Sequence, residues 1–104
     1  MEDFKREIAA LIAQAQTFKC RIVEAEIQSC QLALDFGCLE LRLGFLETAK
    51  HWMKEAEMRS QAIPLVLPDI ANGERREQFK AELDTLRTGL EALRKRLPYT
   101  SSAA

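Results

Sequence analysis

The sequence predicts an all-α protein, a three-helix bundle with a long N-terminal helix and coiled-coil-like packing. Apolar residues recur at alternating steps of four and three along most of the chain, which is the period of a helix and not of a strand. The 104 residues include only four Gly and three Pro, too few for the frequent turns of a β-sandwich. A content of 47% hydrophobic and 30% charged residues is typical of one folded domain. We expect that domain over residues 1–97, followed by a flexible C-terminal tail over residues 98–104.

The first helix is expected from about residue 2 to about residue 43, a length of roughly 60 Å. One apolar stripe follows it with heptad-like spacing and continues to Leu39 and Leu43. A break near residues 16–19, which would fold the front half back onto the bundle, is the alternative. The stripe consists of Phe4, Ile8, Leu11, Ala15, Phe18, Ile22, Ala25, Ser29, Leu32 and Phe36.

A second apolar stripe begins midway along the same helix, on nearly the opposite face. Because the back half is apolar on two faces, we expect neighbours to cover it on both sides. All three cysteines lie on this stripe. Their odd number and their spacing fit neither a closed set of disulfides nor paired zinc ligands, so we interpret them as buried, reduced packing residues. The second stripe consists of Cys20, Val23, Ile27, Cys30, Leu34, Cys38, Leu41 and Phe45.

Gly44 is expected to end the first helix in the left-handed conformation. The next stretch, residues 45–62, predicts an amphipathic helix whose apolar face Phe45 and Trp52 widen. Proline disfavours the helical conformation of the residue before it, so this helix should end before Ile63.

The connection over residues 64–73 is unusually apolar for a loop. Leu65, Leu67 and Ile70 are expected to fold down and plug the end of the bundle. The alternative is an exposed extended segment that docks a partner.

A third helix is predicted over about residues 74–97, with Asp69 or Asn72 as its N-cap. Acidic residues come early in it and basic residues late, which complements the helix dipole. Its apolar seam is Phe79, Leu83, Leu86, Leu90, Leu93 and Leu97.

Small residues recur where the first two helices should touch. In the pattern W-x-x-L-G, the positions of W, L and G are taken by Ala33, Phe36 and Gly37, and Gly44 lies at the following turn. Ala49 and Met53 then stand at the positions of A-x-x-x-F. Over about a third of the chain, this arrangement resembles a single degenerate tetratricopeptide-like helical hairpin. The resemblance implies hairpin geometry and a protein-binding role.

The sequence offers little for catalysis or for cofactor and metal binding. His51, the only histidine, shares one helix face with Glu47 and Glu55, a set that suits surface ion pairs better than metal ligation. No Gly-rich phosphate loop, zinc motif or nucleophile elbow occurs. We therefore expect no catalytic residues, no cofactor and no metal. A metal-binding or enzymatic bundle using His51 is kept as an alternative.

Charge argues against a nucleic-acid or membrane partner. Fifteen basic and sixteen acidic residues give a net charge of −1, and the basic residues of the third helix alternate with acidic ones. No stretch approaches the roughly 18 uncharged residues of a membrane span, and charges at the N-terminus interrupt any secretory pattern, so we expect a cytoplasmic protein without a membrane partner. A small nucleic-acid-binding regulatory protein is a second alternative.

These observations favour a non-catalytic helical interaction or assembly module, and a homodimer in particular. The second helix can cover only the back half of the first, which leaves the apolar front half bare. A second copy would cover it, most simply as a twofold dimer. An unidentified protein partner is the other possible occupant. The interface candidates are Phe4, Ile8, Leu11, Ile12, Ala15 and Phe18.

Overall fold

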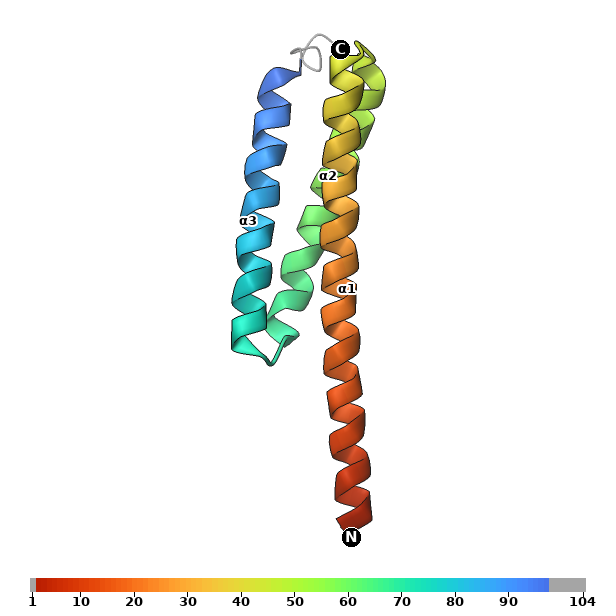
Figure 1. The fold of residues 1–104 in the computed structure, drawn as a ribbon, viewed down its shortest axis with the longest axis vertical. Helices are drawn as coiled ribbons and strands as arrows, with labels where there is room; N and C mark the ends of the chain where they lie inside the picture. The colour runs from red at the N-terminus through yellow and green to blue at the C-terminus, as the bar shows by residue number, and fades with distance from the viewer. Residues whose placement is uncertain (1, 98–104) are drawn as a thin grey trace.

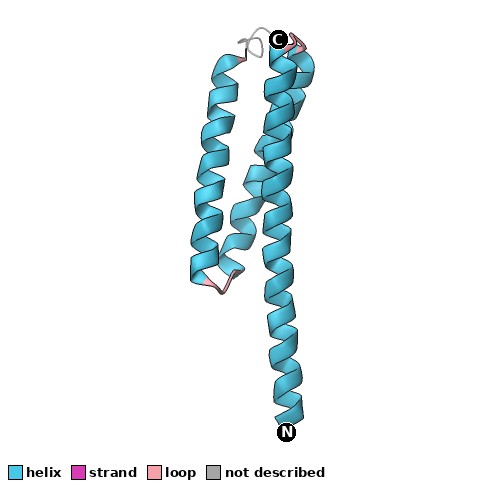
Figure 2. Cartoon of the chain, viewed as in Figure 1, coloured by secondary structure: helices cyan, strands magenta, loops and turns pink. Residues whose placement is uncertain are grey.

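The computed structural model describes residues 2–97 and confirms an all-α fold. It contains three α-helices, α1 (Glu2–Arg42), α2 (Leu46–Val66) and α3 (Gly73–Arg96), and one turn of 3-10 helix, η1 (Leu67–Asp69). No strand occurs in this part of the chain (Figure 2). The molecule measures 66 × 23 × 19 Å, and its length is that of α1 (Figure 1). The expected tail, residues 98–104, lies outside the described residues.

The first helix is continuous, so the alternative of a break near residues 16–19 is wrong. α1 is 41 residues long, about 60 Å. Its back half lies against α2 and α3, while its front half projects beyond the connection between those two helices (Figure 1). The side chain of Gln16 marks the boundary. Its amide bonds the carbonyl of Asp69 at 3.1 Å, and its oxygen accepts the N–H of Ala71 at 2.9 Å. We call residues 2–15, beyond this contact, the arm.

Gly44 ends α1 as predicted. Its φ is +85°, in the left-handed region that glycine adopts without strain. The N–H of Gly44 bonds the carbonyl of Leu41 at 3.1 Å, and the N–H of Phe45 bonds that of Glu40 at 2.9 Å. These two bonds form a Schellman motif, which satisfies carbonyls that the helix end would leave open and turns the chain back into α2.

The second helix runs further than predicted. It passes through Pro64 and ends at Val66, not before Ile63. Proline removes one i to i−4 hydrogen bond, and here that loss falls in the last turn, where few bonds remain. The helical pattern resumes at once, since the N–H of Leu67 bonds the carbonyl of Ile63.

The connection to α3 plugs the bundle with two of the three predicted residues. Leu67 and Ile70 are buried, whereas Leu65 is 78% exposed, contrary to expectation. Because α2 continues to Val66, Leu65 keeps a helical position on the outer side instead of folding inward. Asn72 then caps α3 by accepting the N–H of Arg75 at 3.0 Å, as predicted.

The core lies between the second stripe of α1 and the inner faces of α2 and α3. Small residues allow the close packing there. A Cβ added to Gly37 would lie 2.8 Å from Cδ2 of Leu93 and 3.6 Å from Cβ of Trp52, so three helices meet at this glycine. The buried apolar side chains are Val23, Cys30, Ala33, Leu34, Ala49, Ala56, Ile63, Leu67, Ile70, Phe79, Leu83, Leu86, Leu90 and Leu93.

Within the chain, α1 is covered on one side only, whereas two opposite sides were expected. Both α2 and α3 pack on the side of the second stripe, and Leu32, Phe36 and Leu39 of the first stripe stay exposed. Phe45 is exposed too, since it precedes α2 as its N-cap residue rather than joining the apolar face. The heptad spacing showed correctly that both faces are apolar, but two short helices fit side by side against one of them.

Candidate functional site

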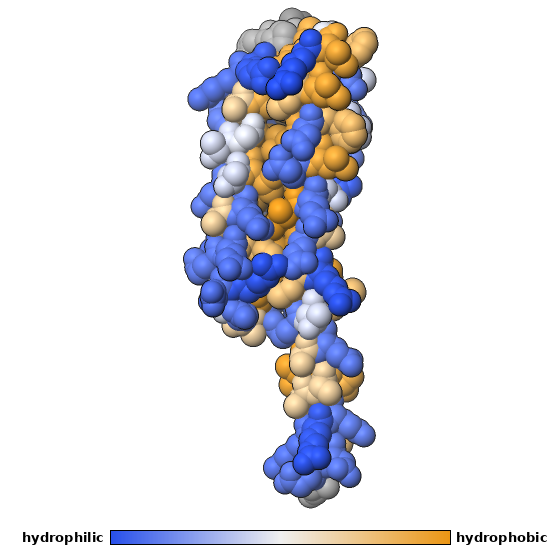
Figure 3. All heavy atoms as spheres, viewed as in Figure 1, coloured by the Kyte–Doolittle hydropathy of each residue, from blue (hydrophilic) through white to orange (hydrophobic). Residues whose placement is uncertain are grey.

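The candidate site is the first apolar stripe of α1, which we now call the outer stripe. It extends from the arm to the end of the bundle, and its exposed members include Phe4 (63%), Phe18 (64%) and Phe36 (38%). On the face drawn in Figure 3, apolar surface appears on the arm and again along the upper right edge of the bundle. The outer stripe consists of Phe4, Ile8, Leu11, Ala15, Phe18, Ile22, Ala25, Ser29, Leu32, Phe36, Leu39 and Leu43, and Ile12 flanks it.

All six predicted interface candidates are exposed. Five of them have large apolar side chains, and the sixth, Ala15, is exposed as well. Residues 8–18 contain no charged side chain, while Asp3, Lys5 and Glu7 lie before them and Lys19 and Arg21 after them. This part of α1 therefore presents an uncharged surface bounded by charges at both ends.

Beside the outer stripe, α1 and α2 form a hollow of about 130 Å³. It opens next to Ser29, whose small side chain leaves space where the stripe elsewhere carries a large one. On the α2 side, Arg59 is held by Glu26 of α1, with Nη1 and Oε2 3.6 Å apart. The lining residues are Ser29, Leu32, Ala33, Trp52, Glu55 and Arg59.

The wall of this hollow is built by aromatic packing. The indole of Trp52 stacks against the ring of Phe36, and the His51 ring forms an edge-on contact with the same indole, with centroids 5.3 Å apart. Trp52 is thereby fixed in a half-buried position. A fixed, partly exposed aromatic side chain beside a hollow is typical of an anchor point for a protein partner.

The residues considered for metal binding are not brought together. Among residues 2–97, no group of three His, Cys, Asp or Glu side chains is placed to hold a metal ion. Glu47 lies 3.7 Å from Lys50 instead, and His51 is exposed against Trp52. His51 therefore packs its ring against Trp52.

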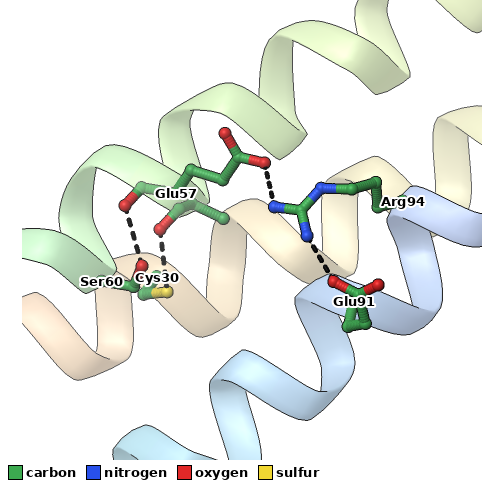
Figure 4. Close-up of polar contacts among 6 residues, drawn as sticks. Cys30, Glu57, Ser60, Glu91 and Arg94 are labelled. Carbon is green, nitrogen blue, oxygen red and sulfur yellow. Dashed lines mark hydrogen bonds and ion pairs between the residues drawn. The ribbon is translucent and has the colours of Figure 1, made fainter.

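The cysteines are free thiols in packing positions. Cys30 is buried and donates its S–H to the carbonyl of Ala56 at 3.4 Å (Figure 4). Burial raises the pKa of the Cys30 thiol. Arg59 lowers it by a smaller amount, and Glu26 adds a further small increase. A raised pKa keeps the thiol protonated and therefore unreactive. Cys20 and Cys38 were expected to be buried as well, but they are half-buried at the edge of the core.

Several basic side chains of α3 have partners within the chain. Arg94 pairs with both Glu57 and Glu91 (Figure 4), and Arg75 pairs with Glu24 while its guanidinium lies 4.4 Å from the centre of the Phe79 ring. Arg76 donates to the carbonyl of Ile70 at 2.8 Å. These contacts direct the guanidinium groups of Arg75, Arg76 and Arg94 toward other groups of the protein.

Comparisons with protein-family models, with curated proteins and with solved structures found no match. The tetratricopeptide resemblance of the α1–α2 hairpin stays a prediction. No helix in the described part of the chain is long and apolar enough to cross a membrane.

Two features of the site were not predicted from the sequence. One is the exposure of the back half of the outer stripe, at Leu32, Phe36, Leu39 and Leu43. The other is the hollow beside Ser29, for which the sequence did contain a signal. Ser29 is the one polar residue in an otherwise apolar stripe, which marks a position where the packing differs.

Proposed function

We propose that this protein is a non-catalytic assembly module that self-associates through the outer stripe of α1. The observation that carries the proposal is the exposure of one apolar stripe, interrupted by the polar Ser29, along a helix of about 60 Å. Soluble monomers rarely expose contiguous apolar patches larger than a few hundred Å².

The size of the stripe is sufficient for a stable dimer. Three phenylalanines exposed by 38–64% contribute about 300 Å² of apolar surface from each chain. Seven partly exposed Leu and Ile side chains on and beside the stripe add to it, and a standard interface takes about 800 Å² per partner. A twofold dimer is the simplest closed assembly that covers the same stripe on both chains.

The surface contacts of residues 2–97 favour a binding function over a catalytic one. The polar contacts of the surface are mainly ion pairs and helix-internal hydrogen bonds, and the hollow beside Ser29 is lined by both apolar and charged groups with no nucleophile–base pair. The outer stripe, which α2 and α3 leave exposed, is apolar apart from Ser29. It therefore suits association with another protein surface.

Light scattering over a range of micromolar concentrations tests the proposal. We expect a mass of twice 11.8 kDa for the native chain. Leu11→Glu places a charge in the stripe, which should cost about 3 kcal/mol of association free energy and give a monomer with its helix content intact. Ala13→Glu, on the opposite side of the same turn, is the matched control and should leave the dimer whole. A single 11.8 kDa species for the native chain would contradict self-association and leave another protein as the occupant of the stripe.

A further inference from the structure

We propose that the second copy binds antiparallel along the whole length of α1, with the arm of each chain lying against the bundle of the other. The inference rests on the proposed self-association and specifies its geometry. In this arrangement the twofold axis passes between Ile22 and Ala25, and Phe4 lies opposite the partner's Leu43. Each arm then becomes a fourth helix beside the partner's α1 and α2.

Side-chain sizes along the outer stripe match in this register. The three small residues of the stripe each face a large one, so no layer is empty and none is overfilled. Ala15 faces the partner's Leu32, Ala25 faces the partner's Ile22, and Ser29 faces the partner's Phe18. The remaining layers pair large residues, with Ile8 opposite the partner's Leu39 and Leu11 opposite the partner's Phe36.

The layer at Ser29 coincides with the hollow between α1 and α2. Phe18 is 64% exposed on one chain, and the hollow beside Ser29 has a volume of about 130 Å³. This volume is close to the roughly 150 Å³ of an apolar cavity that accepts benzene. The phenyl ring of Phe18 therefore has the size to fill the hollow, where it would lie against Leu32 and Trp52 of the partner chain.

The charges that flank the stripe are also complementary. The same register places Lys5 opposite the partner's Glu40, Glu7 opposite the partner's Arg42, and Lys19 opposite the partner's Glu26. The twofold axis makes each of these pairs twice. Two of the other flanking pairs bring a charge against an uncharged residue and the third is uncharged on both sides, so no like charges meet. These pairs are Gln14 with the partner's Asp35, Arg21 with the partner's Gln28, and Ile12 with the partner's Ala33.

Other pairings of the two helices lose these matches. An antiparallel pair shifted by one heptad in one direction sets Lys19 against the partner's Lys19 and Arg21 against the partner's Arg21. The opposite shift sets Glu26 against the partner's Glu26 and leaves Phe4 beyond the end of the partner's α1. A parallel pair sets Ala15 against the partner's Ala15 and Asp35 against the partner's Glu40. Charge repulsion and empty layers disfavour all three.

Complementary charge reversals test the register. In a dimer of Lys5→Glu, the new glutamate faces the partner's Glu40 at both ends of the dimer. In a dimer of Glu40→Lys, the new lysine faces the partner's Lys5 at both ends. Each single variant should dissociate about tenfold more readily than the native chain. When the two variants are mixed, the heterodimer regains two opposite-charge pairs. The mixture should therefore show a higher average mass by light scattering than either variant alone at equal total concentration.

The helix content and melting temperature of each variant serve as the control for folding. Glu40 accepts a hydrogen bond from the Thr48 hydroxyl at 3.2 Å, so the test is repeated with Glu7→Lys and Arg42→Glu, which leave that bond in place. The antiparallel register is overturned if neither mixture of variants has a higher average mass than its two components measured alone. If that result comes with a native dimer that Leu11→Glu still dissociates, self-association stands and only the register is wrong. A monomeric native chain overturns both.

Discussion

The indole of Trp52 stacks on the ring of Phe36, with centroids 5.1 Å apart and planes inclined by 26°. The contact joins α2 to the outer stripe of α1, because Phe36 belongs to that stripe. Trp52 also lines the hollow beside Ser29. The only tryptophan of the chain therefore lies where an arm from a second copy would bind, and it can report on association without a label.

The emission of Trp52 should depend on protein concentration. In the dimer, Phe18 from the second copy would shield the exposed part of the indole from water. Dilution should therefore shift the emission to longer wavelength and raise the access of a neutral quencher. Phe18→Ala should show the shifted emission at all concentrations, whereas Ala13→Glu should behave as the native chain. Emission that stays constant while light scattering detects dissociation would place the interface away from Trp52.

Two helical glycines should respond oppositely to the same substitution. In Gly37→Ala the new methyl would approach Cδ2 of Leu93 to 2.8 Å at the junction of three helices, so overpacking should lower the free energy of unfolding by about 1–3 kcal/mol. In Gly89→Ala the nearest atom, Cδ1 of Leu34, lies at 3.4 Å, close to ordinary contact. That change should raise the free energy of unfolding by about 0.5–1 kcal/mol through the higher helix propensity of alanine. Chemical denaturation measures both, and equal effects would show that the space around Gly37 is not limiting.

Cys30 should react with thiol reagents far more slowly than Cys20 and Cys38 in the native state. It is buried, and its pKa is raised chiefly by desolvation. In the unfolded chain the thiol ionises near pH 9, whereas in the folded chain it stays protonated to higher pH. Above about pH 9 the folded state therefore binds more protons than the unfolded state, so stability falls as pH rises.

The alanine variant isolates this effect of pH. Cys30→Ala removes the thiol, and its free energy of unfolding should fall less steeply than that of the native chain above about pH 9. Parallel curves for the two proteins in that range would contradict a buried, protonated thiol. Labelling of all three cysteines at one rate without unfolding would contradict it independently.

The helices of this fold follow from local sequence signals, and their arrangement does not. The four–three spacing of apolar residues and the left-handed glycine at residue 44 were enough to place α1 and the turn that follows it. The seam from Phe79 to Leu93 identified the buried face of α3. Spacing reports that a face is apolar, but it carries no information on what covers that face, so the exposure of Leu32 and Leu39 had to come from the structure.

Two further errors have local causes. Pro64 was expected to stop α2, but a proline in the last turn removes only one hydrogen bond, and the helix continues. The hollow was missed because it forms between Ser29 and Trp52, which lie on different helices. A pairing across that distance in sequence follows from packing, which residue spacing alone does not describe.

Filling the hollow from within the chain should block association without harming the fold. In Ser29→Phe, the new ring can occupy the space between Leu32 and Trp52 that an incoming Phe18 would take, and the added burial should leave the free energy of unfolding of the monomer unchanged or slightly higher. The dimer should weaken by at least tenfold, because two rings cannot share about 130 Å³. Sedimentation at several concentrations measures the change.

Mixing with Phe18→Ala provides the control, since that chain offers a small residue opposite the new ring and keeps its own hollow open for the other chain's Phe18. Recovery of a heavier species only in the mixture is the expected result, and full dimerisation of Ser29→Phe alone would show that the hollow takes no part in the interface.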